Sequence, residues 1–214
     1  MTRLRLLPPL FLLLAVTACG AGDPTDQERL DAALLRLSDF PSDQGWTVEP
    51  AATDDPAEDD FDAAIDRCEE QHDPTADTSS ADGDSDDFTR GDLVLAGSSA
   101  SVVSDAEARD ALFEAMDPLL ECFGAAMLDA LSREYGETAR VSPPFPLEVT
   151  TAADRTEGRA IQFSVDPVSV FIDVVAIEQG PTLLYGMFLH QGELTVQDEQ
   201  DILAPAVERM KEHT

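Results

Sequence analysis

Residues 159–189 read RAIQFSVDPVSVFIDVVAIEQGPTLLYGMFL, three apolar runs separated by two turn sequences that each contain a proline. In the first run apolar and polar residues alternate, which is the pattern of a strand with one covered face. The second and third runs are apolar at most positions, as expected of central strands that are covered on both faces. We therefore predict an antiparallel three-stranded meander. Its strands are expected at 159–165, 168–177 and 182–189.

The flanking sequence favours helices on both sides of this meander. Residues 104–107, Ser-Asp-Ala-Glu, form a capping box, and an apolar stripe at helical spacing follows as far as Tyr135. Pro118 within that stripe predicts either a kink in one helix or the start of a second helix. Apolar residues at helical spacing also predict helices at 27–37 and 195–211.

Two further extended segments precede the meander. Residues 92–103 alternate small and β-branched side chains and predict a strand, whereas three prolines restrict 141–149 to an edge strand or a connector. The chain of 214 residues is 43% apolar, and its apolar residues are bunched into periodic segments that can bury a core. We expect one α+β domain at 27–214, an antiparallel β-sheet with a C-terminal meander, flanked by helices.

The beginning of the chain predicts export. Two arginines precede an apolar stretch, 6–15, that is too short to cross a bilayer comfortably and is followed by small residues. This arrangement indicates a signal peptide over residues 1–18. The small residues end at Cys19 and resemble the lipobox of bacterial lipoproteins, in which the cysteine becomes the first mature residue and carries acyl chains. The resemblance implies lipidation of Cys19 and a tether at 19–26; the alternative is an ordinary cleaved signal.

The net charge of −31 limits the partners of the protein. Nucleic acid and anionic lipid head groups would be repelled, so we expect no nucleic-acid partner and contact with the membrane only through acyl chains on Cys19. Acylation of Cys19 would leave Cys68 and Cys122 as a pair. In an oxidising compartment a disulfide is the expected state of such a pair.

Two acidic stretches, 51–60 and 73–87, have the composition of loose surface loops. The second contains aspartates at alternate positions, Asp82, Asp84 and Asp86. Alternate aspartates are typical of a calcium-binding loop, but Asp87 and Leu93 stand where such a loop needs its glycine and its closing glutamate. We therefore interpret both stretches as solvated acidic loops and predict no metal site.

The sequence offers little for catalysis. The three histidines, His72, His190 and His213, show none of the spacings of metal-binding or catalytic motifs. The serines at 98–101 lack the glycine of a nucleophile elbow, and no glycine-rich phosphate loop precedes a predicted helix. We expect no enzyme and no cofactor. Polar groups clustered around His190 in the fold would instead favour an unrecognised enzyme.

The order of the elements resembles that of a known group. A lipobox, a tether and a helix are followed by Leu37-Ser38-Asp39-Phe40-Pro41, by Gly45-Trp46, by two cysteines, and then by strand, helix, meander and helix. This order resembles actinobacterial surface lipoproteins whose domain is similar to the extracellular sensor domain of mycobacterial serine/threonine kinases of the PknH type, and more distantly PsbP-like lipoproteins of the LpqN type. The resemblance implies an α+β domain with a binding or sensing role. The kinase sensor domains carry two disulfides, whereas this chain can form one.

We therefore expect a lipid-anchored extracytoplasmic binding or sensor-like module on the outer face of the plasma membrane. The meander is more apolar than one covered face requires, so recognition is expected to be hydrophobic. A groove between the meander and the helix at 105–135 would take an apolar small molecule or an envelope protein. Candidate contacts are Phe171, Tyr185 and Phe188, although the core is the commoner place for each of them. The alternatives are a structural or scaffolding envelope lipoprotein and, less favoured, an unrecognised enzyme.

Overall fold

The computed structural model describes residues 23–49, 67–68, 71–72, 78–91, 94–135 and 138–214. Within these residues the main helices are α1 (Asp26–Ala33), the 3-10 helix η1 (Leu37–Asp39), α3 (Ala106–Tyr135) and α4 (Val196–Glu212). The strands are β1 (Thr47–Val48), β2 (Ser79–Asp84), β3 (Phe88–Arg90), β4 (Val94–Val103), β5 (Ala139–Val141), β6 (Phe145–Leu147), β7 (Arg155–Val165), β8 (Val168–Gln179) and β9 (Thr182–His190). They form a single α+β domain, as predicted.

The strands of the described residues join in one antiparallel sheet. Its order is β1-β3-β4-β9-β8-β7-β5, with β2 also paired to β4 and β6 also paired to β7. The predicted meander is present as β7, β8 and β9, with β7 and β8 paired along the whole length of β7. β5 and β6, from the proline-bearing part of the chain, are three residues long each and pair with the outer side of β7.

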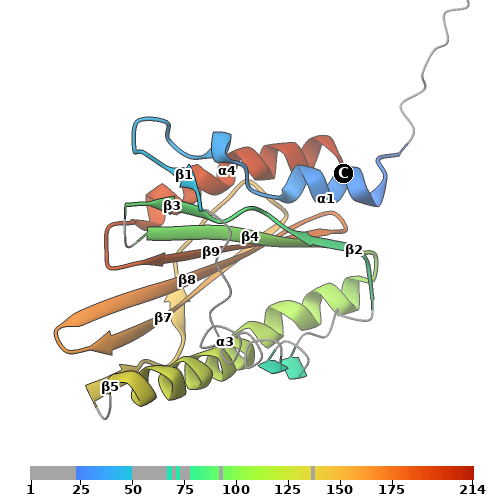
Figure 1. Ribbon diagram of the computed structural model, residues 1–214. Coiled ribbons are helices and arrows are strands. Elements are labelled where there is room, and N and C mark those ends of the chain that lie inside the picture. The colour runs from blue at the N-terminus through green and yellow to red at the C-terminus, as the bar shows by residue number, and fades with distance from the viewer. Residues whose placement is uncertain (1–22, 50–66, 69–70, 73–77, 92–93, 136–137) are drawn as a thin grey trace, which may run out of the picture.

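Helices cover the sheet on both faces (Figure 1). α1 and α4 lie together on one face, which we call the α4 face, and their apolar side chains join those of the sheet in the largest core cluster. α3 lies on the opposite face, the α3 face, where it packs on the meander through two smaller clusters. Because side chains alternate along a strand, Phe188 of β9 faces α4 whereas Tyr185 of the same strand faces α3.

α3 is one continuous helix through Pro118, so no second helix starts there. Its first turn is capped by Asp105, whose Oδ1 accepts hydrogen bonds from the backbone N–H groups of Glu107 (2.8 Å) and Ala108 (3.4 Å). The cap therefore comes from Asp105 rather than from Ser104, the first residue of the predicted capping box.

α1 ends at Ala33, earlier than the sequence pattern predicts, and η1 follows. The guanidinium of Arg209 on α4 accounts for this end, because it donates to the backbone oxygens of Ala32 (3.0 Å) and Leu34 (2.9 Å). The same group forms a two-point ion pair with Asp39 at 2.6 and 2.9 Å. Arg209 thereby joins the end of α1, η1 and α4.

The structure corrects part of the predicted acidic loop at 73–87, because six of its residues form β2, which pairs with β4. Asp82 and Asp84 are exposed, whereas Gly83 between them lies against α1. The alternate spacing of the aspartates is therefore the two-residue period of a strand rather than the spacing of a calcium loop. Outside the described residues lie 51–60 and 73–77.

Cys68 and Cys122 form a disulfide, which confirms the predicted pair. The bond joins residue 68 to α3 across a sequence separation of 54. The predicted signal peptide at 1–18 and Cys19 lie outside the described residues. Among the helices that the structure describes, none combines the length and the apolar character needed to cross a membrane.

Candidate functional site

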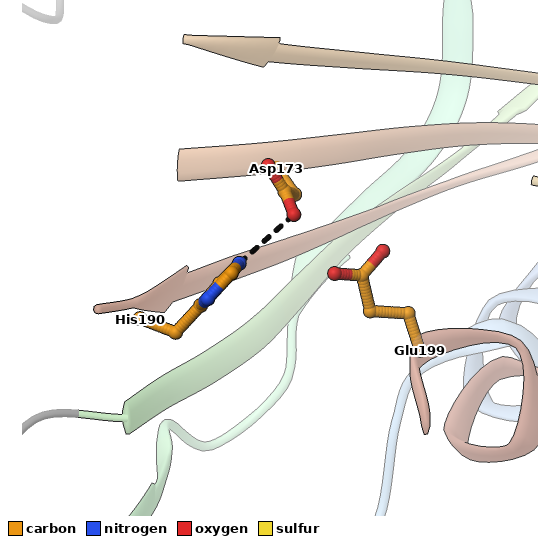
Figure 2. Close-up of side chains that lie close together, drawn as sticks. All are labelled: Asp173, His190 and Glu199. Atoms are coloured by element: carbon orange, nitrogen blue, oxygen red, sulfur yellow. Dashed lines mark hydrogen bonds and ion pairs between the residues drawn. The ribbon is translucent and has the colours of Figure 1, made fainter. Parts of the chain in front are cut away.

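Three polar side chains from different elements meet on the α4 face of the sheet (Figure 2). They are Asp173 of β8, His190 at the end of β9 and Glu199 in the first turns of α4. One potential ligand atom from each residue lies within 4.8 Å of the other two. We call Asp173, His190 and Glu199 the buried acid cluster, because Asp173 and His190 are 5% exposed and Glu199 is 0% exposed.

Strand register places the first two members of the cluster. Asp173 pairs with Ala160 on β7 and with Phe188 on β9, both almost fully buried. Its carboxyl group is therefore held among buried residues of the sheet, with His190 as its hydrogen-bond partner. His190 follows Phe188 by two residues on β9, so the two side chains lie on the same face of the sheet.

A helix cap places the third member. Thr195 precedes α4 and forms a capping box with Asp198: the backbone N–H of Thr195 donates to the carboxylate of Asp198 (2.9 Å), and the backbone N–H of Asp198 donates to Oγ1 of Thr195 (3.2 Å). The hydrogen bonds from Thr195 hold the pKa of Asp198 below its usual value. With its start fixed in this way, α4 directs the carboxyl group of Glu199 toward the sheet (Figure 2).

The hydrogen bonds of His190 fix the position of its ring proton. Nδ1 accepts a hydrogen bond from the backbone N–H of Gly192 (2.9 Å), so Nδ1 carries no proton. The proton of the neutral ring is then on Nε2, which donates to Oδ2 of Asp173 at 2.9 Å. Gly192 has a φ of 102°, which favours glycine and lets the turn after β9 hold this N–H against the ring. His190 is therefore a neutral donor to Asp173.

Glu199 is the most constrained member of the cluster. Both of its carboxyl oxygens are buried and have no hydrogen-bond partner among the described residues. Burial first, and then the neighbouring carboxyl group of Asp173 and the negative charge of Asp198, raise its pKa to about 9. At neutral pH Glu199 therefore keeps its proton, within 4.8 Å of the carboxyl group of Asp173. One resident proton removes one of two negative charges from the interior of the domain.

The nitrogen and oxygen atoms of the buried acid cluster are of kinds that bind a divalent cation. Their protonation state, however, does not suit a metal ion. A histidine that binds a metal offers a nitrogen lone pair to the ion and donates its other ring N–H to a neighbour. In His190 the nitrogen that faces the carboxyl groups carries the proton, and the other nitrogen accepts from Gly192. These contacts therefore fit a neutral histidine beside a protonated glutamate better than a bound cation, and all three side chains are buried.

The three aromatic residues predicted to line a groove lie on different faces of the sheet. Phe188 is fully buried in the core under α4. Phe171 lies on the same face, where its ring stacks on that of His190 with 5.5 Å between the centroids. Tyr185 lies on the other face and packs against the α3 cluster. A groove between the meander and α3 can therefore include Tyr185 but not Phe171 or Phe188, and this part of the prediction is corrected.

Met187 was not among the predicted contacts, yet it is an exposed apolar residue of the α3 face. It follows Tyr185 by two residues on β9 and is 41% exposed. Its register partners are Gly97 on β4 and Val174 on β8, so it lies on an inner strand. Strand alternation from Tyr185 would have placed Met187 on this face. Its exposure depends on where α3 crosses the sheet, which the sequence pattern does not give.

A depression at the turn between β7 and β8 has a mixed polar and apolar lining, unlike the predicted apolar groove. Its lining includes Arg140, Ser164 and Asp166, and it opens widely to solvent. No protein-family model and no curated protein matches the chain. The function is therefore inferred from the residues and contacts of this protein.

Proposed function

We propose that the protein is a lipid-anchored extracytoplasmic binding or sensor-like module, held on the outer face of the plasma membrane by acyl chains on Cys19. The main support for this proposal is the disulfide between Cys68 and Cys122. Disulfides persist in exported proteins and are rare in the cytosol. This bond uses two of the three cysteines of the chain. Cys19, at the end of the signal-like stretch, is the cysteine that remains for acylation.

The α3 face offers the surface for binding. Met187 and Tyr185 lie there beside α3, and Ser99 of β4 pairs with Tyr185 and is exposed. Asp84 of β2 pairs with Ser99 and therefore lies on the same face, at its edge. Met187 and Tyr185, with the carboxylate of Asp84 at the edge, favour a neutral apolar molecule over an anionic one. The ligand that we propose is therefore a neutral, apolar small molecule.

Detergent fractionation of the full chain, expressed in a bacterium that acylates lipoproteins, tests the anchor. The parent should enter the detergent phase, and the Cys19→Ala variant should stay in the aqueous phase, because acylation needs the thiol of Cys19. A Cys68→Ser/Cys122→Ser double variant is the control and should partition like the parent. Recovery of parent and Cys19→Ala in the same aqueous phase would exclude the anchor.

Fluorescence of a hydrophobic dye tests the binding surface. The parent should enhance the fluorescence of the dye, and Met187→Asp should lose most of the enhancement. Val168→Asp is the matched control, because Val168 is 45% exposed and lies at the start of β8, next to the turn from β7 rather than beside Tyr185. Equal enhancement by the parent and both variants would show that the dye binds at another surface. No enhancement by the parent would favour the scaffolding alternative.

A further inference from the structure

We propose that the buried acid cluster is a proton-binding site that makes the packing of α4 on the sheet depend on pH. With its proton in place, Glu199 of α4 is uncharged and lies within 4.8 Å of the carboxyl group of Asp173 on β8. Loss of the proton leaves two negative charges side by side between the helix and the sheet. The inference is independent of the anchor and of any ligand, so its test does not decide the proposed function.

Geometry is the first support for a resident proton. The carboxyl groups of Asp173 and Glu199 lie within 4.8 Å of each other and are both buried. Two carboxylates at this distance cannot both ionise without a cation between them. His190 does not supply that charge, since its Nδ1 accepts the N–H of Gly192 and leaves the ring neutral. A proton resident on Glu199 leaves one negative charge in the cluster and is compatible with these contacts.

The charged groups on the surrounding elements do not neutralise the pair. On α4, the carboxylate of Asp198 adds to the negative charge that Glu199 faces. On β3, the guanidinium of Arg90 acts on Asp198 and donates to the backbone oxygen of Glu193 (3.1 Å). On β7, the register partner of Asp173 is Ala160, which carries no charge. The cluster therefore depends on its own proton.

The resident proton gives the pH dependence a definite sign. In the unfolded chain Glu199 ionises near its ordinary pKa of 4.5, whereas in the fold its pKa is about 9. Between these values the folded protein holds a proton that the unfolded chain has released. The stabilising contribution is complete below pH 4.5 and is lost as the pH rises toward about 9. Over this window the site raises the unfolding equilibrium constant by up to about tenfold per pH unit.

Denaturant unfolding of the full chain, with its disulfide intact, tests the site at several pH values between about 5 and about 8. Glu199→Gln keeps the shape of the side chain and an N–H donor for Asp173 but cannot ionise. The unfolding equilibrium constant of Glu199→Gln should rise less steeply with pH than that of the parent. The difference between the two slopes should be up to about tenfold per pH unit. Glu208→Gln is the matched control, because Glu208 is an exposed glutamate of the same helix, and it should keep the slope of the parent.

Infrared spectroscopy supplies a second measurement. The parent at neutral pH should show the C=O band of a buried protonated carboxyl group, which should disappear on titration to about pH 10, beyond the pKa of Glu199. Equal pH slopes for the parent and Glu199→Gln, or no such band, would overturn the proposal. If Glu199→Gln does not fold, the presence or absence of the C=O band in the parent tests the proposal. Stabilisation of the parent but not of Glu199→Gln by added zinc chloride would identify a cation site and also overturn it.

Discussion

The two faces of the sheet are held by different kinds of contact. On the α4 face, apolar packing is combined with polar groups that are cut off from water, including the Arg209–Asp39 ion pair and the buried acid cluster. On the α3 face, the helix packs through two smaller apolar clusters and through arginine pairs at its border. The side chain of Asp39 is 3% exposed, whereas the acidic partners on the α3 face are more exposed: Glu178, paired with Arg109, is 17% exposed, and Asp117, paired with Arg159, is 54% exposed.

This difference separates stability from recognition. A buried ion pair cannot be broken cheaply, because the remaining charge is left without water, whereas an exposed pair contributes little. The α4 face is therefore expected to carry most of the stability. The α3 face can leave Met187 uncovered and accept changes at its surface. Four tests of this division follow, from the largest expected effect to the smallest.

Neighbouring residues on β9 give the sharpest contrast. Phe188→Ala on the α4 face should lower the free energy of unfolding by on the order of 3 to 5 kcal/mol, because it empties a fully buried site. Met187→Ala on the α3 face should cost less than about 1 kcal/mol, since much of its side chain is already in water. Urea unfolding measures both. Equal losses would show that the two faces do not differ as described.

Removal of Arg209 tests the polar side of the α4 face. Arg209→Ala should cost about 3 kcal/mol, because it leaves the carboxylate of Asp39 buried and unpaired and frees two backbone oxygens at the end of α1. Lys211→Ala, which breaks a surface pair with Glu208, is the control and should cost less than about 1 kcal/mol. A thermal or urea midpoint for Arg209→Ala no lower than that of the control would contradict this assignment.

The disulfide should matter most for the α3 face. Replacing Cys68 and Cys122 with serine should lower the free energy of unfolding by about 2 to 3 kcal/mol, somewhat below the chain-entropy value of about 4 kcal/mol for a loop of this length. Hydrogen exchange should increase in α3 more than in α4. Uniform acceleration across both helices would indicate that the bond stabilises the whole domain equally.

The cap of α4 should give the smallest effect. Thr195→Ala should cost about 1 kcal/mol at neutral pH, because it removes the side-chain half of the capping box. Thr195 also holds the pKa of Asp198 below its usual 3.8, so its contribution is present above that value and is lost as the pH falls through the lowered pKa. The difference between Thr195→Ala and the parent should therefore shrink in acid. A difference that grows in acid would show that Asp198 is not its partner.

Local patterns were sufficient for most of the fold. The meander, the strand at β4 and the helices α3 and α4 follow from apolar periodicity and turn residues, which act over a few positions. β2 was missed because its serines, aspartates and glycine are poor strand formers, and only pairing with β4 and contact with α1 make the segment extended. The end of α1 was missed because Arg209, which fixes it, lies at the far end of the sequence.

The buried acid cluster shows where sequence reasoning stopped. Asp173 is a lone carboxylate within an apolar strand, which was a usable signal, and His190 stands at a strand end. Glu199 gave no signal, because the start of a helix is a favoured place for any acidic residue. That the three side chains meet depends on how α4 lies across β8 and β9, a relation between elements that no local pattern contains. The disulfide was predictable because, once Cys19 is set aside for acylation, Cys68 and Cys122 are the two cysteines that remain to pair.

The guanidinium of Arg209 also determines how the domain would bear a mechanical load. In the proposed anchored protein, a pull on the tether enters the fold at α1, which has only eight residues. Asp26 at its start is also held by Ser80 of β2, whose hydroxyl donates to it at 2.6 Å. Arg209 receives the other end of α1 and passes the force to α4, and through α4 to the sheet. In the proposed anchored protein, the load would therefore reach the α4 face, which is expected to carry most of the stability, before it reaches the α3 face.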